Sequence, residues 1–269
     1  MRAWVFLAGA LLIPAACAPH AMAETVEMDS PSSASDDAEG SLGRAIDDFS
    51  NLASWADFPE QYAQSVISTA SGMLAGRDGV NGHFVVIVDR AVHRQAIFVA
   101  LVSDDGQDWK VVYQGHVSTG KPGRKEHFET PVGVFDLDGS ILDYRAEGTF
   151  NANHIRGIGL KGSRVWDFGW QETDDWRTDG ARMKIRMEMH ATDPANLEHR
   201  IGRADSEGCI RIHADLNAAM DRYGVLDAAA GAMAENGDAR WKQVLGPAHV
   251  FLPESGRYLV VLDSGRETT

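Results

Sequence analysis

Cysteine is almost absent from this sequence. Only Cys17 and Cys209 occur among its 269 residues, and Cys17 lies in the apolar segment at the N-terminus. Many small exported proteins depend on disulfides, and a chain with so few cysteines has no such framework. If Cys17 is removed or lipidated, Cys209 has no partner. It is then either a reactive thiol or an inert, buried cysteine that acts as a small apolar residue.

Positive charge is also scarce. The chain has 25 Lys and Arg against 39 Asp and Glu, and its formal net charge is −14. Nucleic-acid binding requires a concentrated basic face, so we expect no nucleic-acid partner. The basic residues are scattered, except for a small group formed by Lys121, Arg124 and Lys125. We find no internal repeat and no glycine-rich loop of the kind that holds phosphate.

An apolar run from Ala3 to Ala16 follows Arg2 at the N-terminus. The run is short for a membrane span, and the A-x-A sequence before Glu24 is typical of a signal peptidase site. We therefore predict that residues 1–23 are a signal peptide and that the protein is exported to the periplasm or cell envelope. A second interpretation is lipid anchoring at Cys17, although Pro14 stands where lipoprotein signals usually place leucine.

The rest of the chain divides into three parts by composition. Residues 24–41 are acidic and polar, which predicts a disordered linker. Apolar residues at helical spacing on either side of Asp57 predict a helical hairpin over 42–76. Residues 77–269 alternate β-branched runs with turn residues, then show helical patterns at 214–223 and 228–244 and a late strand. We expect a mainly β domain with attached helices, α+β overall.

Three short segments contain the residues that suggest chemistry. They are STGKPGRKEHFETPVGVF at 118–135, MHATDP at 189–194 and SEGCIRI at 206–212. In this order and spacing they resemble the L,D-transpeptidase catalytic domain family, often called YkuD-like, over roughly residues 82–212. The resemblance implies a β-sandwich-like fold. It also implies a cysteine enzyme of the bacterial cell wall that uses no metal and no cofactor.

The resemblance assigns roles by position. Cys209 is the nucleophile and His190 the base, while Ser206 and Arg211 occupy signature positions and Thr192 is a supporting residue. The cysteine of such enzymes attacks the amide after the third residue of a peptidoglycan tetrapeptide stem, releases D-alanine and forms a thioester. The chemistry agrees, because a thiol of ordinary pKa near 8.5 needs an imidazole to take its proton near neutrality.

The backbone near the cysteine has predicted roles of its own. We expect the amides of Gly208 and Cys209 to hold the developing oxyanion. Arg211 either pairs with a stem carboxylate or acts as a structural clamp. Gly120 and Pro131, like Thr119, are expected to be scaffold residues in turns.

Glu207 departs from the family signature, which usually has histidine at this position. A carboxylate beside the nucleophile raises the thiol pKa by charge repulsion. Three interpretations follow: Glu207 points away, it orients the ring of His190 as the third member of a triad, or the site is impaired. We expect Glu207→Gln to retain turnover and Cys209→Ala and His190→Ala to lose it.

Several functions remain open at this point. The acceptor for the thioester is another stem, a lysine of an envelope protein, or water, and a carbapenem is implied as an inhibitor. A domain of another class is a silenced peptidoglycan-binding module. A metal hydrolase is a weaker alternative, since its zinc ligands lack closely paired spacing: they would be His190, His199, Cys209 and His213.

Overall fold

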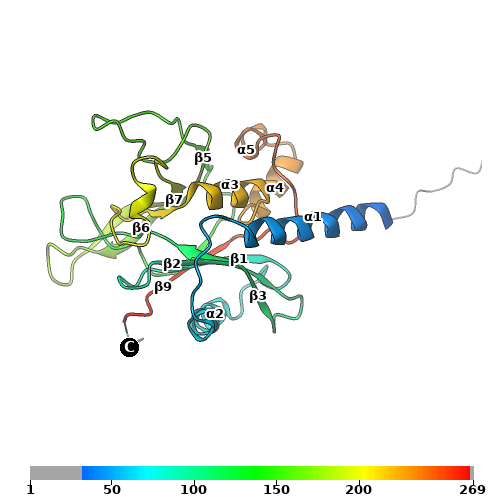
Figure 1. Cartoon of the computed structure of the whole chain (residues 1–269), viewed down its shortest axis with the longest axis horizontal. Helices are drawn as coiled ribbons and strands as arrows, with labels where there is room; N and C mark the ends of the chain where they lie inside the picture. The colour runs from blue at the N-terminus through cyan, green and yellow to red at the C-terminus, as the bar shows by residue number, and fades with distance from the viewer. Residues whose placement is uncertain (1–31, 267–269) are drawn as a thin grey trace, which may run out of the picture.

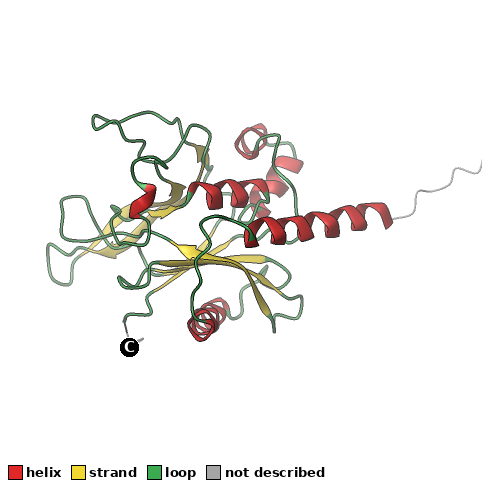
Figure 2. Ribbon diagram, in the orientation of Figure 1, coloured by secondary structure: helices red, strands yellow, loops and turns green. Residues whose placement is uncertain are grey.

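A computed structural model describes residues 32–266 of the chain. The predicted signal peptide and Cys17 lie outside the described residues. Within this part, nine strands form two sheets and five α-helices pack around them (Figures 1 and 2). This confirms the expected class, which is α+β and mainly β.

The first sheet has five strands in the order β3-β2-β1-β9-β4. The strand β9 is parallel to β1 and antiparallel to β4, and the other pairs are antiparallel. Every residue of β1 is buried, which explains its uninterrupted apolar sequence FVVIV. The strands are β1 (Phe84–Asp89), β2 (Ala96–Val102), β3 (Trp109–His116), β4 (Gly133–Asp136) and β9 (Tyr258–Leu262).

The two N-terminal helices, α1 (Ser32–Ser50) and α2 (Glu60–Leu74), cover opposite faces of this sheet (Figure 1). Phe49 of α1 packs in the same core as Val86, whereas Val66 of α2 packs with Ile87 on the other face. The predicted hairpin is therefore wrong. Each helix has an apolar side, but alternate residues of β1 supply a separate apolar surface for each.

Residues 32–41, predicted as part of the linker, are instead helical, because α1 begins at Ser32. A helix satisfies its backbone hydrogen bonds internally and can therefore continue into polar sequence. Its C-terminal half, with Ala45 and Phe49, is anchored in the core.

The second sheet has four strands in the order β5-β6-β7-β8. The strands β7 and β8 are parallel, and the other pairs are antiparallel. Residues from both sheets, α1 and α3 form one apolar core, which is the sandwich-like layer of the fold. The strands are β5 (Tyr144–Arg145), β6 (Arg164–Asp174), β7 (Arg182–Ala191) and β8 (Ile210–Ile212).

Three helices follow β8 and match the helical patterns at 214–223 and 228–244. They are α3 (Ala214–Arg222), α4 (Ala228–Glu235) and α5 (Ala239–Leu245). The second pattern is broken at Gly237, whose φ of 99° favours glycine, and α4 and α5 share a small core around Trp241. Among the helices of residues 32–266, none combines the length and apolar character needed to span a membrane.

Candidate active site

The parallel pairing of β7 and β8 brings the second and third sequence segments together. Met189 is paired with Ile210, and His190 with Arg211. Met189 and Ile210 are fully buried in the core. Paired residues of neighbouring strands share a face, and successive residues alternate between faces. The opposite face of the sheet therefore carries the polar series Arg186, Glu188 and His190 beside Cys209 and Arg211.

His190 is a buried, neutral imidazole. Its Nδ1 lies 2.6 Å from the carbonyl oxygen of Ala191. A carbonyl only accepts, so Nδ1 carries the proton and Nε2 keeps a lone pair. Burial lowers the pKa of His190 to about 4, and the positive charge of Arg211 acts in the same direction. The imidazole is therefore an unprotonated base at neutral pH.

Cys209 is the one free cysteine among the described residues, and it is partly exposed. Its Sγ lies 3.9 Å from the carbonyl oxygen of Arg186. Burial raises the pKa of the Cys209 thiol to about 11, and the carboxylates of Glu188 and Glu207 add to this while Arg211 opposes it. At rest the site thus holds a neutral thiol and a neutral imidazole.

The turn before Cys209 is held by the side chain of Ser206. The Oγ of Ser206 donates to the carbonyl of Cys209 over 2.5 Å and accepts from the amide of Gly208 over 3.2 Å. Gly208 has a φ of 136°, a conformation that favours glycine. Since the Gly208 amide already has a partner, this geometry does not support its expected role in an oxyanion hole. The role of the Cys209 amide stays a prediction.

The first sequence segment supports this turn from behind. Thr130 Oγ1 accepts from the amide of Gly120 over 2.9 Å and donates to the carbonyl of Gly208 over 2.8 Å. A Cβ on Gly120 would lie 1.9 Å from the carbonyl oxygen of Phe128 and 2.9 Å from Gly208 Cα. Only glycine fits between these two stretches of backbone. The S-T-G and T-P segments therefore position the cysteine turn without touching the thiol.

Glu207 is exposed to solvent. The ring of His190 is oriented by the carbonyl of Ala191, which takes the place that a triad carboxylate would occupy. Of the three interpretations of Glu207, the structure favours the one in which it points away. Its charge still acts on the thiol, as a minor contribution to the raised pKa of Cys209.

Two buried polar atoms near the site have no hydrogen-bond partner within residues 32–266. They are Arg211 Nε and Thr192 Oγ1. Arg211 also donates from Nη1 to the carbonyl of Asp205 over 3.3 Å, which is a clamp of the loop before the cysteine. Buried polar groups are normally paired, so both atoms remain candidates to meet a polar group of the substrate.

Sequence reasoning missed a carboxylate whose charge acts on the thiol. Glu188 lies two residues before His190 on the same face of β7, and Tyr144 of β5 donates to its Oε1 over 3.0 Å. Burial raises the pKa of Glu188. The alternation of R-M-E-M-H was the available signal, because it places Glu188 beside His190, but the contact with Tyr144 spans 44 residues of sequence.

The four residues considered as zinc ligands do not come together as a metal site. Among the described residues, no three His, Cys, Asp or Glu side chains lie close enough together to hold a metal ion. His213 instead faces Glu198, with 3.5 Å between Nδ1 and Oε1.

Comparison with known families agrees with this geometry. The sequence model described as the L,D-transpeptidase catalytic domain matches residues 83–225, just over half of the chain. No curated protein matches the chain. The matched range runs from β1 to just beyond α3 and includes all three sequence segments. The chain therefore belongs to the YkuD family of L,D-transpeptidase catalytic domains.

Proposed function

We propose that this protein is an exported cysteine L,D-transpeptidase that acts on peptidoglycan tetrapeptide stems. Family membership implies a domain that modifies peptidoglycan. The observation that supports the finer assignment is the parallel pairing of the strand that carries His190 with the strand that Cys209 directly precedes, with Nε2 of His190 unprotonated. A cysteine thiol and a neutral imidazole that can take its proton are the two groups that nucleophilic acyl transfer requires.

The reaction follows from the protonation states. The Sγ of Cys209 attacks the carbonyl carbon of the third residue of the stem as its proton passes to Nε2 of His190. The C–N bond breaks, and His190 returns the proton to the amine of the leaving D-alanine, which leaves a thioester on Cys209. An acceptor amine then attacks the thioester and loses a proton to His190, which finally restores the thiol.

The same thioester serves three acceptors. An amine of another stem gives a 3-3 cross-link, a lysine gives attachment of an envelope protein, and water gives hydrolysis. We propose the cross-link as the main product.

A second candidate, a silenced peptidoglycan-binding module, draws support from the raised pKa of Cys209. A thiol that ionised only near pH 11 without help would react slowly at neutral pH. The enzyme is supported instead by the neutral imidazole of His190, whose ring is oriented by the carbonyl of Ala191 and not by the exposed Glu207.

Mass spectrometry separates these functions. The purified protein is incubated with a disaccharide tetrapeptide, beside its Cys209→Ala variant. A cross-linked dimer establishes transpeptidation, and tripeptide alone establishes hydrolysis. If no product depends on Cys209, and a carbapenem adds no mass to the protein, the enzyme assignment is wrong and the binding module replaces it.

A further inference from the structure

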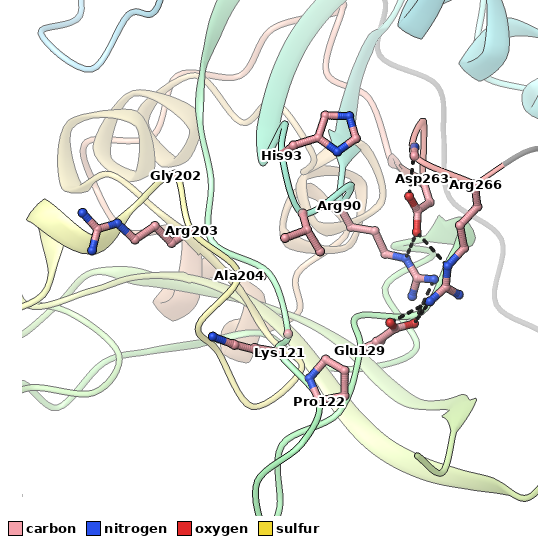
Figure 3. A pocket seen from close by; sticks show the side chains of 13 residues that line it. Arg90, His93, Lys121, Pro122, Glu129, Gly202, Arg203, Ala204, Asp263 and Arg266 are labelled. Carbon is pink, nitrogen blue, oxygen red and sulfur yellow. Dashed lines mark hydrogen bonds and ion pairs between the residues drawn. The ribbon is translucent and has the colours of Figure 1, made fainter. Parts of the chain in front are cut away.

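A cavity of about 670 Å³ lies on the other side of the segment that supports the cysteine turn (Figure 3). Its wall is formed by five stretches of the chain: the turn after β1, the loop at 120–122, Glu129 just before β4, the loop at 202–204 and the stretch after β9. Cys209 and His190 are not among its lining residues. The cavity is large enough for a substantial ligand and has no role in the reaction described above.

One side of the cavity is a balanced set of charges. Arg90 lies 3.1 Å from both Glu129 and Asp263, and Arg266 donates to Glu129 over 2.8 and 3.0 Å. Figure 3 shows these four side chains in one connected network. The charges of the two guanidinium groups and the two carboxylates cancel. This side of the cavity therefore fixes its shape and adds no net charge.

The remaining charges of the cavity are positive. Lys121 and Arg203 line it, are exposed, and make no ion pair within the described part of the chain. His93, also exposed, completes the lining on the side of the β1 turn (Figure 3). Two unpaired cations in one cavity are unusual in a chain whose formal net charge is −14. They create a local positive potential that favours an anionic ligand.

The cavity and the cysteine turn share a wall. Arg90 donates from Nη1 to the carbonyl of Thr130, whose hydroxyl in turn donates to the carbonyl of Gly208. Gly120 lines the cavity and is packed against Gly208 on its opposite side. Only the backbone at Gly120 therefore separates a ligand in the cavity from Gly208, the residue that precedes Cys209.

We propose that this cavity is a second binding site, which takes a carboxylate-bearing part of a peptidoglycan strand outside the peptide being cut. The inference rests on the proposed function in one respect, since that function makes peptidoglycan the source of the anion. Stem peptides carry free carboxylates, and Lys121 and Arg203 supply the two cations that would pair with them. Such a site would hold the enzyme on the polymer while Cys209 reacts.

Binding to insoluble peptidoglycan sacculi tests the proposal. The protein carries Cys209→Ala to prevent turnover, and co-sedimentation gives its apparent Kd. We expect Lys121→Gln combined with Arg203→Gln to weaken binding about tenfold, which corresponds to about 1.4 kcal/mol. The matched control is Arg124→Gln with Lys125→Gln, two exposed cations on the same loop that do not line the cavity. We expect the control to change binding less than about twofold.

The source of the anion is tested with sacculi whose stem carboxylates have been converted to amides. The difference between parent and cavity variant should then disappear. An equal loss in the control pair, no loss in the cavity pair, or a difference that survives amidation overturns the proposal, the last because the anion would then be another polymer or a lipid phosphate. Because Cys209 is absent from these proteins, the result is independent of whether the proposed reaction takes place.

Discussion

At the scale of single residues, burial keeps both reacting groups uncharged. The thiol of Cys209 has a raised pKa and the imidazole of His190 a lowered one, so no ion pair forms at rest. The thiolate is the form of cysteine that reacts with oxidants and stray electrophiles. In the proposed reaction, a protonated Cys209 would thus be protected until a substrate carbonyl is in place and His190 takes the proton during attack.

The first prediction concerns alkylation of Cys209. With iodoacetamide, the rate should keep rising through pH 9 and level off near pH 11, because the pKa of the thiol is raised to about 11 by burial. An ordinary thiol levels off above about pH 8.5. Intact-mass spectrometry against pH gives the curve, with Cys209→Ala as the blank. A plateau already reached below pH 7 would show a thiolate–imidazolium pair instead.

The second prediction concerns His190 and stability. Its pKa is lowered to about 4 in the folded state, whereas the unfolded chain binds the proton near pH 6.5. The unfolded state therefore binds more protons between these values, and the free energy of unfolding should fall by about 3 kcal/mol as the pH drops from 6.5 to 4.

Denaturant unfolding at several pH values measures this loss. His190→Gln should remove most of this pH dependence, while His83→Gln, a change outside the site, should keep it. An unchanged pH dependence in His190→Gln would contradict the buried neutral imidazole.

At the scale of elements, the site depends on a short strand placed beside a long one. β8 has three residues, and β7 has ten and is also paired with β6. The short strand is secured from its other side by the bridge between Ser118 and Arg211 and by Thr130. The position of Cys209 is therefore set by the S-T-G and T-P segments as much as by the sheet.

The third prediction follows from this support. Thr130→Val keeps the side-chain volume but removes the hydroxyl that pairs with the Gly120 amide and the Gly208 carbonyl. Each buried group left unpaired costs about 1–3 kcal/mol. We expect a lower melting temperature and slower acylation of Cys209 by a carbapenem. Thr69→Val, which removes an exposed hydroxyl contact within α2, should leave both unchanged. If Thr130→Val were acylated at the parent rate, the position of the cysteine turn would not depend on the Thr130 hydroxyl.

Local patterns predicted most of the elements. The β-branched runs expected within residues 77–269 include the strand at 96–102, and the apolar helical spacing expected after Asp57 corresponds to α2. The predicted roles of Cys209 and His190 rest on three short sequence segments whose order and spacing are distinctive. The packing of α1 and the partner of Glu188 were not predictable, because both depend on contacts between segments far apart in sequence.

At the scale of the whole molecule, a buried ion cluster joins the second sheet to the C-terminal helices. Arg164 has no exposed surface and lies 2.7 Å from Asp143 and 2.9 Å from Asp227. Asp227 immediately precedes α4, so the cluster links β6 to the helical part. Burial raises the pKa of Asp143 to about 6, against the opposing effect of Arg164.

The fourth prediction concerns this cluster. Arg164→Met leaves two buried carboxylates without their cation, and removing one partner of a buried pair costs about 3–5 kcal/mol. Arg182→Met removes an exposed pair with Asp174, 2.7 Å apart, and should cost less than about 1 kcal/mol. Urea unfolding of both variants checks the contrast. If both variants lost similar amounts of unfolding free energy, the ion cluster at Arg164 would not be what stabilises the contact between β6 and the C-terminal helices.

The position of β9 affects when the protein becomes reactive. This strand, at residues 258–262, is inserted between β1 and β4, and Leu259 and Val261 complete the core beneath the sheet that carries Cys209. A growing chain cannot assemble that core until its last strand has been made, and contacts between such distant segments form slowly. A product of interrupted synthesis would contain the thiol but lack the surroundings that direct it. The proposed activity would therefore belong only to chains that have been completed through this strand.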